Sequence, residues 1–193
     1  MARFIGGDWS EELRIFQLAE EPETTGRIGS ERRMTNEEHS PIVEDGHPAL
    51  EMIAAEVPHG ADVTDIIRTM RYAQSSHPRS CVGLAANQIG ETVRIILIVT
   101  DTFDGAIINP VYVRHGKTLK HSREGCISFP GFDQKMIRHE IVEIQGYNED
   151  WQPVRYKLKR FLAFVAQHEM DHLDGFTLKN PRPGTFVSET RAA

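Results

Sequence analysis

A run of two histidines and a glutamate inside an apolar helical pattern places the strongest constraint on this chain. Residues 159–173 repeat apolar side chains at helical spacing, and Gly175 follows as a stop signal. Within that stretch stand His168, Glu169 and His172. On a helix, histidines four residues apart share one face and can reach one metal ion, with the glutamate beside it as a base. A catalytic metal usually has three protein ligands, so another must come from elsewhere in the chain.

The other helices and strands that the sequence predicts are mostly short. We predict helices at 49–55 and 62–76, and strands at 93–100, 107–113, 141–147 and 153–158. The strand at 107–113 is interrupted by Asn109-Pro110, and the last two strands form a hairpin. Because helices and strands do not alternate, the predicted fold class is α+β, with small mixed or antiparallel sheets packed around the central C-terminal helix.

Three regions differ in composition. Residues 1–40 are predicted to be a polar extension, partly disordered or draped over the domain, with one short amphipathic helix near 10–18. Residues 41–178 form the domain that carries the candidate chemistry, and 179–193 form a polar tail.

Charge and hydropathy exclude several classes of protein. The net charge of −6 argues against direct binding to nucleic acid or to an anionic membrane. No apolar run is long enough to cross a bilayer, and the N-terminus lacks an apolar signal core, so the expected location is the cytoplasm. In that reducing compartment Cys81 and Cys126 are expected to remain thiols.

Two further segments support a metal site. Cys126 lies in Glu124-Gly125-Cys126-Ile127-Ser128, where a thiolate would complete a Cys/His/His set with one open position. The small-residue run 83–90 ends near the Gln88 amide, which can donate a hydrogen bond. The alternatives are a buried cysteine, a tight packing corner and two hydrogen-bonded histidines.

In chain order, the Gln88 run comes first, the Cys126 run second and the H-E-x-x-H helix last, and this ordered set of motifs resembles that of peptide deformylase. The family's G-x-G-x-A-A-x-Q, E-G-C-x-S and H-E-x-D-H motifs correspond to 81–88, 124–128 and 168–172, and the resemblance extends over 41–178. It implies a hydrolase that removes the N-formyl group from N-formylmethionyl peptides of nascent proteins and releases formate. The expected partners are therefore formylated nascent peptides, with transient proximity to the ribosome.

The resemblance also implies a role for each site residue. Cys126, His168 and His172 would hold one divalent metal ion, usually Fe²⁺, with Zn²⁺, Ni²⁺ or Co²⁺ as substitutes. Glu169 would take a proton from water and pass it to the departing amine. The Gln88 amide and the Ile127 N–H would stabilise the developing oxyanion.

The predicted methionine pocket is apolar. Plain core is the commoner interpretation of an apolar stripe at this spacing, and one surface can serve as both core face and pocket wall. Its predicted wall residues are Val82, Gly83, Phe161, Phe164 and Val165. Around the metal, we predict that Glu124 orients a ligand histidine. We also predict that Asp171 pairs with Arg138, and an ordinary ion pair is the alternative for both acids.

The sequence departs from the family motifs at three places. Cys81 replaces the first glycine, Asn87 stands where proline is usual, and no arginine follows Pro130 in the segment 131–135. These differences leave open an amidase of the same fold with another N-acyl preference. A non-catalytic metal-binding decoy and a generic zinc peptidase are the remaining alternatives.

Overall fold

The computed structural model describes residues 14–17, 26–27, 41–77 and 81–186. Its strands are β1 (Arg14–Gln17), β2 (Gly26–Arg27), β3 (Ala61–Asp62), β4 (Gly83–Ala85), β5 (Ile95–Val99), β6 (Asp104–His115), β7 (Leu119–Cys126), β8 (Phe129–His139), β9 (Ile141–Tyr147) and β10 (Pro153–Lys159). The helices are α1 (Thr64–Ser76) and α2 (Arg160–Leu173), with the 3₁₀ turns η1 (Pro48–Glu51) and η2 (Ala86–Ile89).

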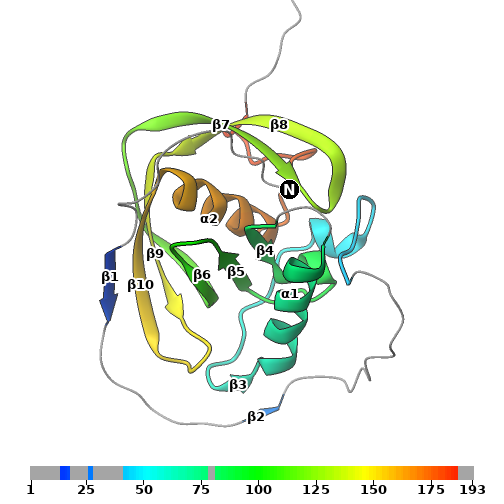
Figure 1. Ribbon diagram of the computed structural model, residues 1–193, viewed down its shortest axis with the longest axis vertical. Coiled ribbons are helices and arrows are strands. Elements are labelled where there is room, and N and C mark those ends of the chain that lie inside the picture. Colours follow the sequence, from blue (N-terminus) through cyan, green and yellow to red (C-terminus); the bar gives the residue numbers. More distant parts are fainter. Residues whose placement is uncertain (1–13, 18–25, 28–40, 78–80, 187–193) are drawn as a thin grey trace, which may run out of the picture.

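Most strands form one antiparallel sheet in the order β1-β10-β9-β6-β5-β4. A long separate hairpin, β7–β8, forms the second sheet, and β2 and β3 form a short parallel pair. Figure 1 shows α2 between the β7–β8 hairpin and the large sheet. This arrangement confirms the predicted α+β class with sheets packed around the C-terminal helix.

Strand β5 explains why two helices can cover the large sheet. Its residues are buried from both sides, and successive side chains point to opposite faces. Ile96 and Ile98 join the core cluster that contains the apolar side of α2, whereas Ile95 and Leu97 join the cluster that contains α1. Helix α2 is therefore packed on the face opposite α1, and it is buried along nearly its whole length.

Several predicted elements are present with small shifts at their ends. The helix predicted at 62–76 is α1, the strand at 93–100 is β5, and the hairpin of 141–158 is β9–β10. The interruption at Asn109-Pro110 is a register shift in the β6–β9 pairing, where Asn109 has a φ of 50°. Asparagine tolerates this left-handed conformation better than most residues do.

Two local predictions are wrong. The helix expected at 49–55 is only the short turn η1, because the following backbone bonds to other segments: Ala54 N–H donates to the Leu173 carbonyl, and Ala55 N–H to the Thr92 carbonyl. The amphipathic helix expected near 10–18 is contradicted at Arg14–Gln17, which pairs with β10 as strand β1. The remainder of that predicted helix lies outside the described residues. In the described part of the chain, no helix is long and apolar enough to cross a membrane.

Candidate metal centre

Three buried side chains meet where α2 faces the β7–β8 hairpin. The ligand atoms of Cys126, His168 and His172 all lie within 4.8 Å of one another. The Cys126 Sγ is 3.3 Å from His172 Nε2, and the two imidazole rings are 5.0 Å apart, nearly perpendicular. The structure thus brings together the three residues that the sequence predicts as metal ligands.

Local geometry explains how these residues converge. The histidines are one helical turn apart on α2, so their rings project from the same face. Cys126 is the last residue of β7, just before the two-residue turn at Ile127 and Ser128. The β7–β8 register shifts between Gly125 and Cys126, which brings Cys126 opposite Phe129 at the tip of the hairpin. Helix and hairpin supply the ligands from opposite sides.

The charge distribution of this cluster suits a cation. Burial opposes ionisation of Cys126, but the charge of His172 and hydrogen bonds from His168 and His172 hold the pKa of its thiol well below the usual value. Burial likewise opposes protonation of His168, but its bonds to Cys126 and Glu124 outweigh that penalty and raise its pKa to about 10. One thiolate and two imidazoles form a donor set used for zinc and iron. The residues present therefore fit a divalent metal ion.

Glu169 lies beside the cluster and is almost fully buried. Its Oε2 atom has no hydrogen-bond partner among the described residues. Burial dominates its environment and raises the pKa of its carboxyl group to about 7, although the two histidines act in the opposite direction. Gly83 makes room for this carboxylate, because a Cβ at residue 83 would collide with Glu169 Oε1. A carboxylate oxygen with no partner in the described part of the chain thus lies next to the three candidate ligand side chains.

The Gln88 amide is oriented toward the same cluster. Its Oε1 accepts a hydrogen bond of 2.9 Å from the Ala85 N–H. That bond leaves the amide nitrogen pointing at Cys126 Sγ and Ser128 Oγ, each 3.2 Å away. Ile127 is buried in the neighbouring turn of the hairpin. The two groups expected to stabilise an oxyanion therefore lie next to the candidate metal ligands.

A buried ion-pair network supports one of the histidines. His168 Nδ1 is 3.0 Å from Glu124 Oε2, and Arg138 holds both Glu124 oxygens at 2.9 and 2.8 Å. Arg138 also reaches Asp171 at 2.5 Å, which confirms the predicted pair. Although burial opposes it, the charge of Arg138 lowers the pKa of Glu124 to about 2. Glu124 therefore stays anionic and favours the tautomer of His168 that carries its proton on Nδ1.

The network continues into the C-terminal segment, which the sequence did not indicate. Arg182 donates to Asp171 at 2.7 Å and to Asp174 at 2.6 Å. Arg94, next to β5, donates to Asp174 at 2.8 Å from the other side. A single arginine in a polar tail has no periodicity that would reveal this contact.

The predicted pocket residues divide into two groups. Gly83 contacts the site directly, since a Cβ there would also lie 2.6 Å from a methyl group of Val165. Phe164 and Val165 belong to the core cluster around α2, and Val82 and Phe161 are partly buried against it. The structure brings all five near α2, and their role in holding substrate stays a prediction.

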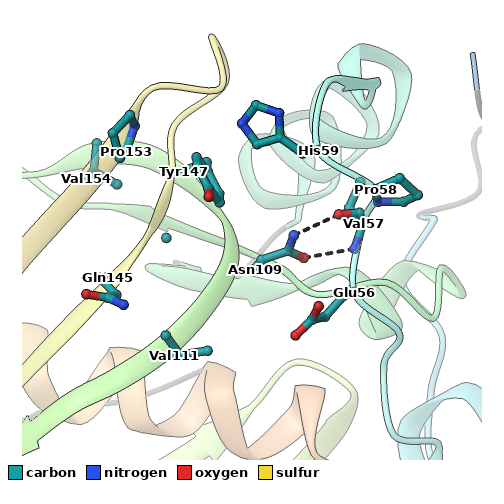
Figure 2. Close-up of a pocket in the computed structure, with 11 residues that line it drawn as sticks. Glu56, Val57, Pro58, His59, Asn109, Val111, Gln145, Tyr147, Pro153 and Val154 are labelled. Atoms are coloured by element: carbon teal, nitrogen blue, oxygen red, sulfur yellow. Dashed lines mark hydrogen bonds between the residues drawn. The ribbon is translucent and has the colours of Figure 1, made fainter. Parts of the chain in front are cut away.

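A separate hollow of about 590 Å³ is lined by residues of β6, β9 and β10 and by residues 56–59. Figure 2 shows it between the strand ends near Tyr147 and Pro153 and the loop of Glu56 to His59. Asn109 ties that loop to β6 through two hydrogen bonds of 2.8 Å with the Val57 backbone. The lining includes none of the candidate metal ligands or their neighbours named above.

Comparison with known proteins identifies one family. The sequence model of the polypeptide deformylase family matches residues 39–182. A peptide deformylase of Picosynechococcus is 38% identical over 122 residues, which cover 60% of this chain and 65% of the relative, just under two thirds. One from Pelotomaculum thermopropionicum is 36% identical over 137 residues, covering 69% of this chain and 85% of the relative.

Solved structures agree with these sequence matches. A deformylase of the Vibrio parahaemolyticus bacteriophage VP16T, crystallised with actinonin, has 44% identity and a TM-score of 0.68, covering 70% of this chain and 98% of its own. A peptide deformylase from Synechococcus elongatus, also with actinonin, has 30% identity and a TM-score of 0.68, covering 80% and 85%.

Proposed function

Because this chain belongs to the polypeptide deformylase family, we propose that it removes the N-formyl group from formylmethionyl peptides of nascent proteins and releases formate. It is then a hydrolase acting on a linear amide. The observation that carries the proposal is the convergence of Cys126, His168 and His172. Beside them lies the Glu169 carboxylate, whose Oε2 has no hydrogen-bond partner among the described residues. The matches do not favour an altered substrate preference or a non-catalytic decoy.

The proposed cofactor is one divalent metal ion held by Cys126, His168 and His172, with Fe²⁺ as the native ion and Zn²⁺, Ni²⁺ or Co²⁺ as substitutes. A bound divalent ion supplies Lewis acidity, which lowers the pKa of a water molecule and polarises a carbonyl group. Thiolate and imidazole ligands accept all of these ions, so the donor set alone does not decide among them.

The remaining chemistry belongs to the side chains around the ligands. Glu169 accepts the proton of the attacking water and delivers it to the departing amine, a task suited to a carboxyl group whose pKa is about 7. The Gln88 amide nitrogen donates to the oxygen that becomes negative, and the Ile127 N–H is its proposed partner. Gly83 keeps the space beside Glu169 open, and Val82, Phe161, Phe164 and Val165 are the proposed apolar wall for the methionine side chain.

The proposed partners are formylated nascent peptides, which places the enzyme transiently near the ribosome and in the cytoplasm. Direct binding to nucleic acid is not expected, because the net charge is −6.

Formate release from a formyl-Met-Ala peptide tests the proposal. Protein purified anaerobically should be active, lose activity in air and regain it with Ni²⁺ or Co²⁺, because a thiolate-held ferrous ion is sensitive to oxidation. Absence of formate with every metal would refute the proposed reaction. Retention of full activity in air would instead contradict iron as the native ion.

The Gln88→Ala variant tests the oxyanion role. Removing one such donor costs about a hundredfold or more in turnover, and the metal content should be unchanged because Gln88 is not a proposed ligand. Metal analysis and formate release on the same sample measure both quantities. Turnover like that of the wild type would remove Gln88 from the mechanism.

A further inference from the structure

Asn87 is completely buried, and it connects the turn that carries Gln88 to the end of α2. Its amide nitrogen donates to the backbone carbonyl of His172. That carbonyl is one of the last in α2, and the Gly175 N–H also donates to it at 3.0 Å. Carbonyl groups at a helix end lack partners within the helix, so a side-chain donor there fixes the position of the last turn. In this case the fixed residue is a proposed metal ligand.

Asn87 and His172 each have one further polar side-chain atom that is not used in this hydrogen bond. Asn87 Oδ1 and His172 Nδ1 are both buried, and neither has a hydrogen-bond partner in the described part of the chain. One is an acceptor, and the other is a donor whenever His172 binds a metal through Nε2. Buried polar atoms are almost always paired, directly or through an ordered water molecule.

The two candidate ligand histidines therefore differ in their support. His168 has Glu124 on its Nδ1 at 3.0 Å. For His172 the Nε2 faces Cys126 at 3.3 Å, and its Nδ1 has no such carboxylate. Histidines that bind metals usually donate their other N–H to an acceptor, which sets the tautomer and the ring orientation. Among the described residues, Asn87 is hydrogen-bonded to His172 and still has an acceptor to offer.

We propose that Asn87 is the positioning residue of His172, its Nδ2 anchoring the carbonyl of the last helical turn and its Oδ1 accepting the Nδ1–H through one buried water. This inference rests on the proposed metal site. It also links the two halves of the site, since Asn87 precedes Gln88 in η2 and holds a ligand in α2. A displacement of either element is then transmitted to the other.

A matched pair of substitutions tests the proposal. Asn87→Gly removes the two side-chain functions next to His172. Asn109→Gly removes the same two functions from the Val57 backbone, far from the ligands, and glycine tolerates the positive φ of residue 109. Co²⁺ affinity is measured by chelator competition, and the thiolate-to-cobalt absorption band and the unfolding free energy are recorded for each protein.

We expect Asn87→Gly to bind Co²⁺ about 10- to 100-fold more weakly than the wild type, and Asn109→Gly to bind it normally whatever stability is lost. Asn87→Asp keeps an acceptor and nearly the same volume but loses the amide donor to the His172 carbonyl, so it should restore only part of the affinity that Asn87→Gly loses. In the Zn²⁺-loaded wild type, the His172 Nδ1–H proton should give an exchange-protected NMR signal that Asn87→Gly abolishes.

The outcomes separate this inference from the function on which it depends. A wild type that binds no Co²⁺ and no Zn²⁺ would overturn both. Normal binding by the wild type, with equal affinities in the Asn87→Gly and Asn109→Gly variants, would overturn the role of Asn87 alone. Persistence of the NMR signal in Asn87→Gly would overturn the acceptor role.

Discussion

Replacing Gly83 with alanine should impair turnover much more than folding. The added Cβ would lie 2.6 Å from Val165 Cγ1 and 3.0 Å from Glu169 Cδ. Carbon atoms in contact are about 3.5–4.0 Å apart, so these neighbours would have to retreat by roughly 0.5–1.4 Å. Val165 is fully buried and stiff at χ1, whereas the Glu169 carboxylate ends a longer side chain. The carboxylate is therefore the group that gives way most easily, and the contact with Val165 is the source of the overpacking cost.

Moving a catalytic group by about 1 Å can cost about a hundredfold in rate, which corresponds to about 2.7 kcal/mol in the activation barrier. Overpacking should lower the unfolding free energy by no more than about 1–3 kcal/mol, and residue 83 has no positive φ that would add strain. The assay is formate release, with metal content and denaturant unfolding measured on the same sample.

Gly105→Ala is the matched control, because its added Cβ would be 3.7 Å from the nearest Phe103 atom, an ordinary contact. It should turn over substrate normally. A Gly83→Ala protein that is folded, metal-loaded and as active as the wild type would refute the proposed position of Glu169 as the base.

Three further substitutions separate metal binding, proton transfer and stability. Glu169→Gln should keep the metal and lose about 10²–10⁴-fold in turnover, measured by formate release; loss of the metal would make Glu169 a ligand. Cys126→Ser should lose the thiolate-to-cobalt band and most of the metal affinity, whereas Cys81→Ser, at the other buried thiol, should keep both; equal loss would contradict the assigned ligand set. Arg138→Leu should lower the unfolding free energy by about 3–5 kcal/mol, since it removes the arginine that holds both oxygens of the fully buried Glu124 carboxylate. Arg155→Leu breaks an ion pair in which the arginine is 38% exposed, so it should lower the unfolding free energy by less than about 1 kcal/mol. Equal losses for Arg138→Leu and Arg155→Leu in denaturant unfolding would show that burial does not determine how much an ion pair contributes to stability.

The sequence was most informative where local periodicity and tertiary burial agree. Helix α2 has apolar residues at helical spacing and a glycine after its end, and the structure places it at the centre of the fold. The β9–β10 hairpin follows from alternating side chains around a turn. The predicted contact of Glu124 with a candidate ligand histidine is confirmed by its 3.0 Å distance from His168 Nδ1. These features depend on residues close in sequence or on motifs in a fixed order.

Other features depend on distant partners and left no local signal. The β7–β8 hairpin is long, but its outer residues are charged and exposed, so the sequence indicated only a constrained loop or short strand at Cys126. Arg182 joins the ion-pair network from a tail without periodicity. The contact of Asn87 with the His172 carbonyl spans 85 residues and requires that η2 and the end of α2 meet.

Strand β1 is an edge strand of the large sheet, next to β10. It covers the outer row of backbone N–H and C=O groups on β10. An unpaired edge strand can pair with strands of neighbouring molecules and so promote self-association. A truncated protein starting at Met34 would keep every residue of the candidate centre but would leave the edge of β10 unpaired. We therefore expect it to aggregate more readily than the full chain while its chemistry is preserved.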